Sequence, residues 1–450
     1  MNIDKERTHT DEEKVNIDKE RMLRDKEIQR LKSFGRYLFQ LLKWVFFAII
    51  TGVVVGSFGI LFAKSMNFVT ELRNKYDFIV FFLPVIGIVI VAMYSFAVKG
   101  RKDRGTNAVI SAVSSTEDLP FRVAPLIFIA TVLTHLGGGS AGREGAALQL
   151  GGSIGNFIGK IFRIDENDRK VIIMCGMSAA FSALFGTPMA ASIFAVEVIS
   201  VGILHYSAWV PCVFSALVAS RFASDMGIRA EHFNIIDVAE LNVPNAFKIV
   251  VLALVCAIVS IAFCYVLHYT DRFLKKIISN AYIRVFAAGT AIVLAGLLFG
   301  TTDYFGAGVN VIERAIEGDV IWYAFIAKML FTAVTLSAGY KGGEIVPSFF
   351  VGATLGCLLG HIMGISPSMC AAVGMIALFC GVTNCPMTSL LISFELFGYE
   401  VVPFFLMAVA VSYMMSGYTG LYKDQKIMYS KSKTKYINKK VSDIYESQSK

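Results

Sequence analysis

Long apolar stretches separated by short polar segments dominate the chain after its first 37 residues. The apolar stretches are 38–64, 78–98, 123–136, 171–185, 189–220, 246–268, 283–299, 320–338, 345–363, 370–397 and 401–417. A helix needs about 20 mostly apolar residues to cross a bilayer, so the pattern predicts a helical membrane protein with about ten or more membrane segments. Glycine and proline interrupt the stretches around 136–155 and 339–360, and we expect helices there to end inside the membrane beside a cavity.

Composition and charge agree with a membrane protein and indicate its orientation. The 450 residues are 55% hydrophobic and 17% charged, which excludes a soluble domain of this length. The first 37 residues are polar and lack the apolar core of a signal peptide, so we expect the N-terminus to be cytoplasmic. The tail after Tyr422 has eight lysines and three acidic residues, which predicts a cytoplasmic C-terminus by the positive-inside rule. No pattern indicates a nucleic-acid partner.

The chain repeats itself internally. Three blocks of the first half recur in the same order in the second, roughly 200 residues later. The recurring positions are Gly105, Asn107 and Ala112 with Gly308, Asn310 and Ala315; Gly142, Gly151, Gly155 and Gly159 with Gly343, Gly352, Gly356 and Gly360; and Gly176, Pro188 and Glu197 with Gly374, Pro386 and Glu395. We predict a polar arm (1–37), a first membrane repeat (38–226), a linker (227–243), a second membrane repeat (244–422) and a basic tail (423–450).

Helix starts inside the membrane predict an anion site. If each half crosses the membrane an odd number of times, the second half is inverted and equivalent loops meet at the midplane. Helices starting near Gly105, Gly142, Gly308 and Gly343 would then direct free backbone N–H groups at one point. Such a point carries partial positive charge without a full cation, which suits a small anion that must also be released.

Four motifs resemble those of the CLC family of chloride channels and proton-coupled anion antiporters. They are Gly142-Arg143-Glu144-Gly145, Gly105-Thr106-Asn107-Ala108-Val109, Gly343-Glu344-Ile345-Val346-Pro347 and Gly420-Leu421-Tyr422, and the resemblance covers about 38–430. It implies an all-α polytopic membrane protein with a CLC-like fold of two inverted repeats and broken intramembrane helices. It also implies a homodimer in the cell membrane with one pore in each subunit and no cofactor or metal.

The resemblance assigns roles to particular residues. Glu144 would be the gating carboxylate, which occupies an anion site when ionised and leaves it when protonated. Thr106 and Tyr422 would donate hydroxyl groups to the central anion, and backbone N–H groups would complete the sites, from Arg143, Gly145, Glu344, Ile345 and Val346. Three alternatives remain: Arg143 and Glu144 form an ordinary ion pair, Thr106 caps a helix, or Tyr418 takes the place of Tyr422.

The chain departs from the family pattern at three places. Thr106-Asn107 replaces Ser-Gly in a loop that also lacks its proline, and Glu344 puts a second carboxylate beside the anion path. Val198 stands where many family antiporters have an inner proton-carrying Glu. Glu344 is similar to the fluoride/proton antiporter branch, although that branch often has Thr at the position of Val346. The choice between chloride and fluoride stays open.

Glu197 and Glu395 occupy equivalent positions of the two repeats and lie in apolar segments. Ionisable groups within the membrane are costly and often functional, so a proton relay is one interpretation. A helix-end carboxylate that is capped or paired at a subunit contact is the interpretation we favour.

Proton-coupled antiport of chloride or fluoride, gated by Glu144, is the function we predict. The alternative is a passive voltage- or pH-gated chloride channel without proton coupling, which Val198 favours. A sodium-coupled transporter of organic solutes is a third hypothesis, although the crowded glycine runs favour a compact monatomic ligand. The sequence has no nucleotide-binding, metal-helix or nucleophile motif, so we predict that it is not an enzyme.

Overall fold

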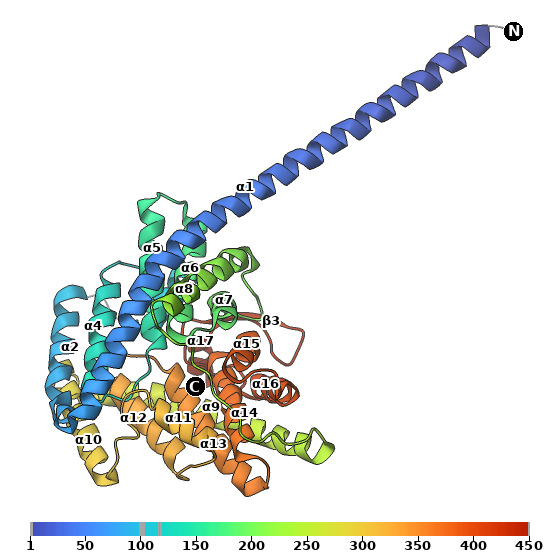
Figure 1. The fold of residues 1–450 in the computed structure, drawn as a ribbon. Helices are drawn as coiled ribbons and strands as arrows, with labels where there is room; N and C mark the ends of the chain where they lie inside the picture. Colours follow the sequence, from blue (N-terminus) through green and yellow to red (C-terminus); the bar gives the residue numbers. More distant parts are fainter. Residues whose placement is uncertain (1–2, 99–103, 116, 118, 449–450) are drawn as a thin grey trace. The chain divides into compact units, whose positions relative to one another are not determined.

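The computed structural model describes residues 3–98, 104–115, 117 and 119–448 (Figure 1). The first two residues of the predicted arm and the last two of the predicted tail lie outside the described residues. The chain divides into two compact units, Met1–Phe47 and Ala48–Lys450. The first unit is the N-terminal part of helix α1 (Ile3–Lys75), and the second contains all the predicted site residues.

Two sets of eight α-helices follow one another along the described chain. Each helix of the first set corresponds to the helix with the same position in the order of the second set. The first set is α1, α2 (Leu83–Val98), α3 (Thr106–Ser114), α4 (Val123–Leu136), α5 (Glu144–Ile161), α6 (Glu166–Phe185), α7 (Pro188–Glu197) and α8 (Trp209–Asp225). The second is α9 (Val243–Ile277), α10 (Ala281–Phe299), α11 (Val309–Ile316), α12 (Ala324–Ala338), α13 (Ile345–Met363), α14 (Pro367–Thr383), α15 (Pro386–Phe397) and α16 (Val402–Met415). In both sets a short third helix follows the first two, as expected for a duplicated chain.

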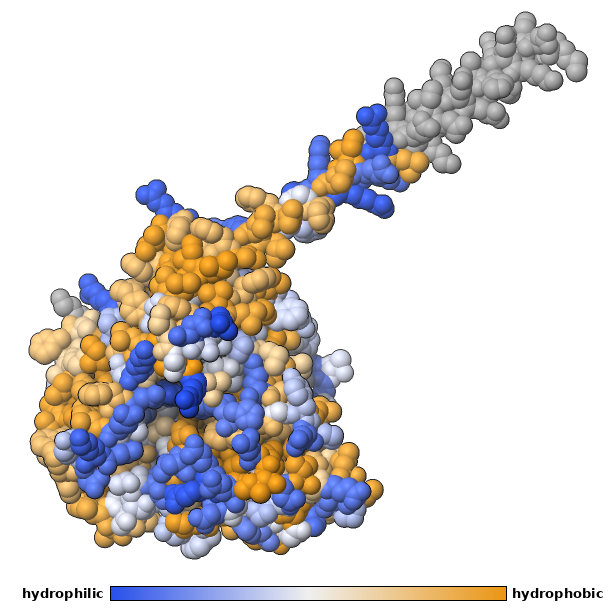
Figure 2. Space-filling view, in the orientation of Figure 1, coloured by the Kyte–Doolittle hydropathy of each residue, from blue (hydrophilic) through white to orange (hydrophobic). Residues whose placement is uncertain are grey.

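Five helices of the described chain are long and apolar enough to cross a membrane: Met22–Lys75, Asp77–Ala97, Val243–Ile277, Ala281–Phe299 and Ile345–Met363. Six further apolar helices are shorter, in agreement with the prediction that some helices end inside the membrane. Figure 2 shows apolar side chains over parts of the visible face of the second unit, beside hydrophilic areas. Phe96 and Leu298 are among the most exposed large apolar side chains of the described chain. Such a surface suits lipid rather than water.

Two predicted stretches are each divided into two helices. The stretch 370–397 breaks between α14 and α15, where Asn384 adopts a left-handed conformation with φ of 60° just before Pro386. The stretch 189–220 breaks between α7 and α8, where β1 (Ser200–Val201) and the short 3₁₀ helix η2 (Tyr206–Ala208) intervene. Asparagine and proline end helices for local steric reasons, so the first break was readable from the sequence. The second break contains β1, which pairs with a strand of the distant tail, so the local sequence does not indicate it.

The repeated glycines are the points where helices touch. A Cβ on Gly151 of α5 would collide with the carbonyl of Gly176 on α6, and the reverse holds as well. Gly352 of α13 and Gly374 of α14 make the equivalent contact in the second set. Small residues allow membrane helices to approach until their backbones meet, where van der Waals contact holds them together. The predicted glycine blocks therefore place α5 against α6 and α13 against α14.

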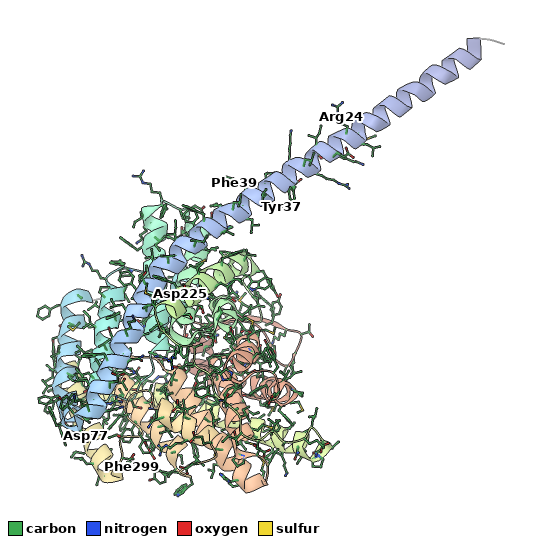
Figure 3. The ribbon with its side chains drawn as sticks, viewed as in Figure 1. Arg24, Tyr37, Phe39, Asp77, Asp225 and Phe299 are labelled. Carbon is green, nitrogen blue, oxygen red and sulfur yellow. The ribbon has the colours of Figure 1, made fainter. Side chains whose placement is uncertain are left out.

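Short elements complete the second unit. The 3₁₀ helix η1 (Asp77–Phe82) contacts the end of α10, and Asp77 and Phe299 mark this region in Figure 3. After α16 the tail forms β2 (Lys426–Tyr429), β3 (Tyr436–Lys440) and α17 (Val441–Gln448). Strand β2 pairs in parallel with β1 and antiparallel with β3. The predicted tail is thus joined to the segment that follows α7.

We expect Gly151→Ala to destabilise the protein by about 1–3 kcal/mol, because the added methyl group forces α5 away from α6. Thermal unfolding of the detergent-purified variant measures the loss. Gly35→Ala is the matched control, since Gly35 lies in a helix with nothing within 4 Å of the added Cβ. Equal unfolding temperatures for the two variants would contradict the close contact.

Candidate functional site

The two glycine-rich broken segments meet through backbone hydrogen bonds in the second unit. The Gly142 N–H donates to the Gly343 carbonyl at 2.7 Å, and the Gly343 N–H donates to the Gly142 carbonyl at 2.8 Å. Helix α5 starts at Glu144 and α13 at Ile345, so both helix N-termini open beside this antiparallel bridge. A Cβ on Gly343 would lie 2.6 Å from the Gly145 nitrogen, which explains why the position is a glycine. The bridge brings together the two glycine-rich segments that the sequence singles out.

Glu144 is fully buried and its carboxylate lies in this opening. Oε1 accepts the backbone N–H of Arg143 at 3.1 Å, and Oε2 accepts the backbone N–H of Val346 at 3.2 Å. The two donors belong to opposite halves of the chain, at the starts of α5 and α13. Free N–H groups at helix starts favour negatively charged groups, and here they bind the Glu144 carboxylate.

A second carboxylate, that of Glu344, lies close by. Its Oε2 is buried without a hydrogen-bond partner in the described chain, and it is 3.5 Å from the position of a Cβ on Gly145. Glu144 is among its charged neighbours. Two carboxylates at close range repel each other when both are ionised, and a proton on either one relieves that repulsion. The sequence predicts both the backbone N–H and a second carboxylate of Glu344 beside the anion path, and in the structure the Glu344 carboxylate has Glu144 as a charged neighbour.

Thr106 and Gly145 face each other across the starts of α3 and α5. The Thr106 hydroxyl donates to the Gly145 carbonyl at 3.3 Å and accepts a long hydrogen bond of 3.4 Å from Gln149 Nε2. Gln149 is buried in α5, and its Oε1 has no partner in the described chain. Sequence reasoning missed Gln149, although a polar residue in a Gly/Ala-rich intramembrane helix is a signal for a site residue. Ile345 is buried at the first position of α13.

Tyr422 has a buried hydroxyl without a hydrogen-bond partner in the described chain, and Glu344 and Glu144 are among its charged neighbours. The alternative residue, Tyr418, is placed differently. Its hydroxyl lies 2.7 Å from that of Ser430, and its side chain packs on a small apolar cluster formed by Val201, Ile427 and Val441. An unsatisfied buried hydroxyl is costly unless a ligand uses it, so Tyr422 is the better candidate for the anion.

A cavity of about 610 Å³ leads to these residues from the side where the tail lies. Its lining includes Thr106, Gln149 and Glu344 together with five cationic side chains, those of Arg104, Lys275, Arg284, Lys341 and Lys423. Asp271 and Asp424 are the other acidic residues of the lining. An excess of positive charge in the lining attracts anions into the cavity.

Arg143 is engaged away from the Glu144 carboxylate. Its guanidinium pairs with Glu231, from the segment between the two helix sets, and lies 5.4 Å from the centre of the Phe185 ring. The Glu231 N–H donates to the Phe185 carbonyl at 3.2 Å, which fixes the pair. The geometry therefore does not support an ordinary ion pair between Arg143 and Glu144, and only the Arg143 backbone reaches the site.

One of the four predicted helix starts does not join the others. Gly308 precedes α11, but it lies against Phe350 and Lys328 rather than against the two carboxylates. Lys328 is fully buried in α12 and donates to the Gly306 carbonyl at 2.7 Å. The Lys328 ammonium donates to the Tyr304 and Gly306 carbonyls, so a full positive charge lies beside the start of α11. The prediction was wrong for Gly308.

Glu197 and Glu395 cap each other's helices. Glu197, at the end of α7, accepts the backbone N–H groups of Met387 and Thr388 at 3.0 and 2.8 Å, at the start of α15. Glu395, in the last turn of α15, accepts those of Met189 and Ala190 at 2.8 and 2.9 Å, at the start of α7. The two helices are therefore antiparallel, and equivalent segments of the two sets are inverted. A carboxylate at a helix N-terminus is an ordinary stabilising cap.

Comparisons with known proteins agree with this geometry. The family model described as voltage gated chloride channel matches residues 86–417. A protein of Pseudomonas syringae pv. tomato named chloride/fluoride channel protein is 33% identical over 398 residues, with 87% of this chain and 88% of that protein covered. The H(+)/Cl(-) exchange transporter ClcA of Citrobacter koseri is 26% identical, with 78% and 80% covered.

Solved structures give the same result. A CLC-type fluoride/proton antiporter superposes with a TM-score of 0.83 at 32% identity, over 86% of this chain and 99% of that one. A slow cyanobacterial Cl−/H+ antiporter, at 19% identity, shares the fold with a TM-score of 0.72 over 83% and 94% of the two chains. The predicted all-α fold of two inverted repeats with broken intramembrane helices is confirmed.

We expect Glu197→Gln to lower stability by about 1.5–3 kcal/mol, because the neutral amide puts a donor where the carboxylate accepts an N–H group. Thermal unfolding measures the loss, with the exposed residue Glu400 as the control in Glu400→Gln. A change in proton movement at an unaltered unfolding temperature would instead support the relay interpretation.

Proposed function

The chain belongs to the CLC family, and we propose that it exchanges a halide for protons across the membrane, with Glu144 as the gate. Transport of inorganic anions is the activity for which related proteins are named, as a chloride/fluoride channel protein and as H(+)/Cl(-) exchange transporters. The family consists of transporters and channels rather than enzymes.

The observation that carries the proposal is the place of the Glu144 carboxylate among backbone donors from both halves. An ionised carboxylate excludes a free anion from these donors. A protonated one has lost its charge, so it leaves the donors more readily and carries a proton with it. A single side chain thus alternates between blocking the anion and carrying the proton, which couples the two movements. The hydroxyls of Thr106 and Tyr422 and the N–H groups of Arg143, Gly145, Glu344, Ile345 and Val346 would bind the anion.

Fluoride is the halide that we propose for this exchange. The relative at 33% identity is named a chloride/fluoride channel protein, and the solved structure at 32% identity is a fluoride/proton antiporter. Glu344 adds a second buried carboxylate to the site, so that a proton can reside on either of two side chains. Chloride remains the competing substrate to compare with it.

A passive chloride channel is the second candidate. Val198 gives the end of α7 no ionisable side chain at the position where many family antiporters have an inner glutamate. With the neighbouring Glu197 engaged as a helix cap, protons would need a path through Glu344. A channel would need no such path.

We further propose a homodimer in the cell membrane with both termini in the cytoplasm. The tail carries eight lysines against three acidic residues, and a basic segment next to the last membrane helix favours the cytoplasmic side. Residues of this tail line the cavity of about 610 Å³, so the cavity would be the cytoplasmic entrance.

We expect Glu144→Gln to abolish proton movement driven by a halide gradient, because the amide cannot take up or release a proton at this place. Proteoliposomes loaded with fluoride or chloride, with pH and halide recorded together, provide the measurement. Glu400→Gln, at an exposed position, should behave as the wild type. Halide currents without any proton movement in the wild-type protein would reject the antiporter and favour the channel.

We expect Tyr422→Phe and Thr106→Val each to weaken halide binding about fivefold, which corresponds to the loss of one hydrogen bond of about 1 kcal/mol. Calorimetric titration of the purified protein with fluoride and chloride measures the affinity. Tyr418→Phe is the matched control, because the hydroxyl of Tyr418 already interacts with Ser430. An equal loss in the control would contradict the assignment of Tyr422.

A further inference from the structure

Tyr422 lies outside the membrane helices, in the segment that connects α16 to the tail. The Gln425 N–H donates to the Tyr422 carbonyl at 3.1 Å, which folds this segment into a turn. The buried Gln425 amide then donates to the carbonyls of Val198 and Thr383, both at 3.0 Å, at the ends of α7 and α14. The position of the Tyr422 hydroxyl therefore depends on the tail as well as on the membrane helices.

Asp424 connects three separate parts of the chain. Its carboxylate accepts Arg104 Nη2 at 2.6 Å and Lys440 Nζ at 3.2 Å, and its backbone N–H donates to Asn107 Oδ1 at 3.1 Å. The Asp424 side chain is only 11% exposed, whereas those of Arg104 and Lys440 are 35% and 38% exposed. Hydrogen bonds with Glu117 and with Asp424 raise the pKa of Arg104, so the guanidinium keeps its charge in this network.

The network bridges the two hydroxyl groups of the site. Arg104 and Asn107 flank Thr106 at the start of α3, and Asp424 follows Tyr422 by two positions. Asn107 is one of the departures from the family motif, and its side chain makes the contact with the Asp424 backbone. The residue that replaces a glycine thus has a structural role that joins the first motif to the last.

We propose that Asp424 is a positioning residue that holds the Tyr422 segment against the start of α3 and so sets the separation of the Thr106 and Tyr422 hydroxyls. The inference rests on the proposed function, in which both hydroxyls bind the anion. Through Lys440, strand β3 of the tail takes part in the same network. The tail thereby controls the geometry of the inner side of the anion site.

Breaking this network should change halide binding more than it changes the free energy of unfolding. An ion pair whose cationic partners are partly exposed to solvent contributes little to the free energy of unfolding. Hydrogen bonds to an anion, in contrast, weaken steeply once the donor moves beyond its normal distance. A small displacement of the Tyr422 segment therefore weakens anion binding while the fold persists.

Asp424→Asn tests the proposal in the full-length protein. We expect the calorimetric dissociation constants for fluoride and chloride to rise about three- to fivefold. In proteoliposomes we expect fewer protons to move for each halide, at a nearly unchanged unfolding temperature. Asp424→Glu, which restores the charge, should recover part of the affinity. Should Asp424→Asn not fold, Asn107→Ala removes the other link and carries the same expectation.

The control is Asp271→Asn, which removes one negative charge from the same cavity. Asp271 pairs with Lys275 at 2.5 Å and more distantly with Lys423 at 4.0 Å, so its loss leaves the contacts of Asp424 with Arg104 and Asn107 in place. We expect the halide dissociation constants of this variant to stay at the wild-type values. Equal changes in both variants would mean that the cavity charge, and not the position of Tyr422, is responsible, and the proposal would be overturned.

A double-mutant cycle isolates the link. Arg104→Gln and Asp424→Asn should be non-additive in the halide dissociation constant, whereas Arg104→Gln and Asp271→Asn should add. Additivity in the first pair would overturn the proposal. If the wild-type protein moves no protons, the antiporter proposal fails, but the dissociation constants of the cycle still decide the role of Asp424.

Discussion

The reciprocal hydrogen bonds between Gly142 and Gly343 determine how the rest of the site is arranged. They join the two halves through backbone atoms alone, at the points where α5 and α13 begin. Because no side chain intervenes, the free N–H groups of both helix starts can approach one carboxylate from opposite sides. The close glycine contacts of α5 with α6 and of α13 with α14 hold the two helices in the directions that this approach requires.

The charge of Glu144 is compensated by peptide dipoles rather than by a cation. The neighbouring cation, Arg143, is engaged elsewhere, because its guanidinium pairs with Glu231. A full positive charge at the centre would bind an anion or a carboxylate too tightly for release. Several partial charges give moderate attraction, which lets a carboxylate and a halide replace each other.

Much of this arrangement was predictable because it depends on local or repeated features. The repeated glycines mark helix contacts, and the motif around Glu144 marks a helix start in an apolar segment. The failure at Gly308 has a different cause, since a buried lysine from a separate helix changes the loop before α11. Likewise, the hydrogen bond from Arg104 to Asp424 joins residues more than 300 positions apart. Neither hydrophobic periodicity nor a short sequence motif predicts such a contact.

The Glu144 side and the Tyr422 side of the site are therefore held in place by interactions that differ in rigidity. The Glu144 side depends on backbone N–H groups at the starts of two buried helices, which have little freedom to move. The Tyr422 side depends on side chains of a short tail segment, and Arg104 and Lys440 there are partly exposed to solvent. Weak, solvent-accessible ion pairs open at low cost. In the proposed exchange one side of the site binds its ions precisely and the other lets them pass, and the fold provides this asymmetry by building the Tyr422 side from the tail.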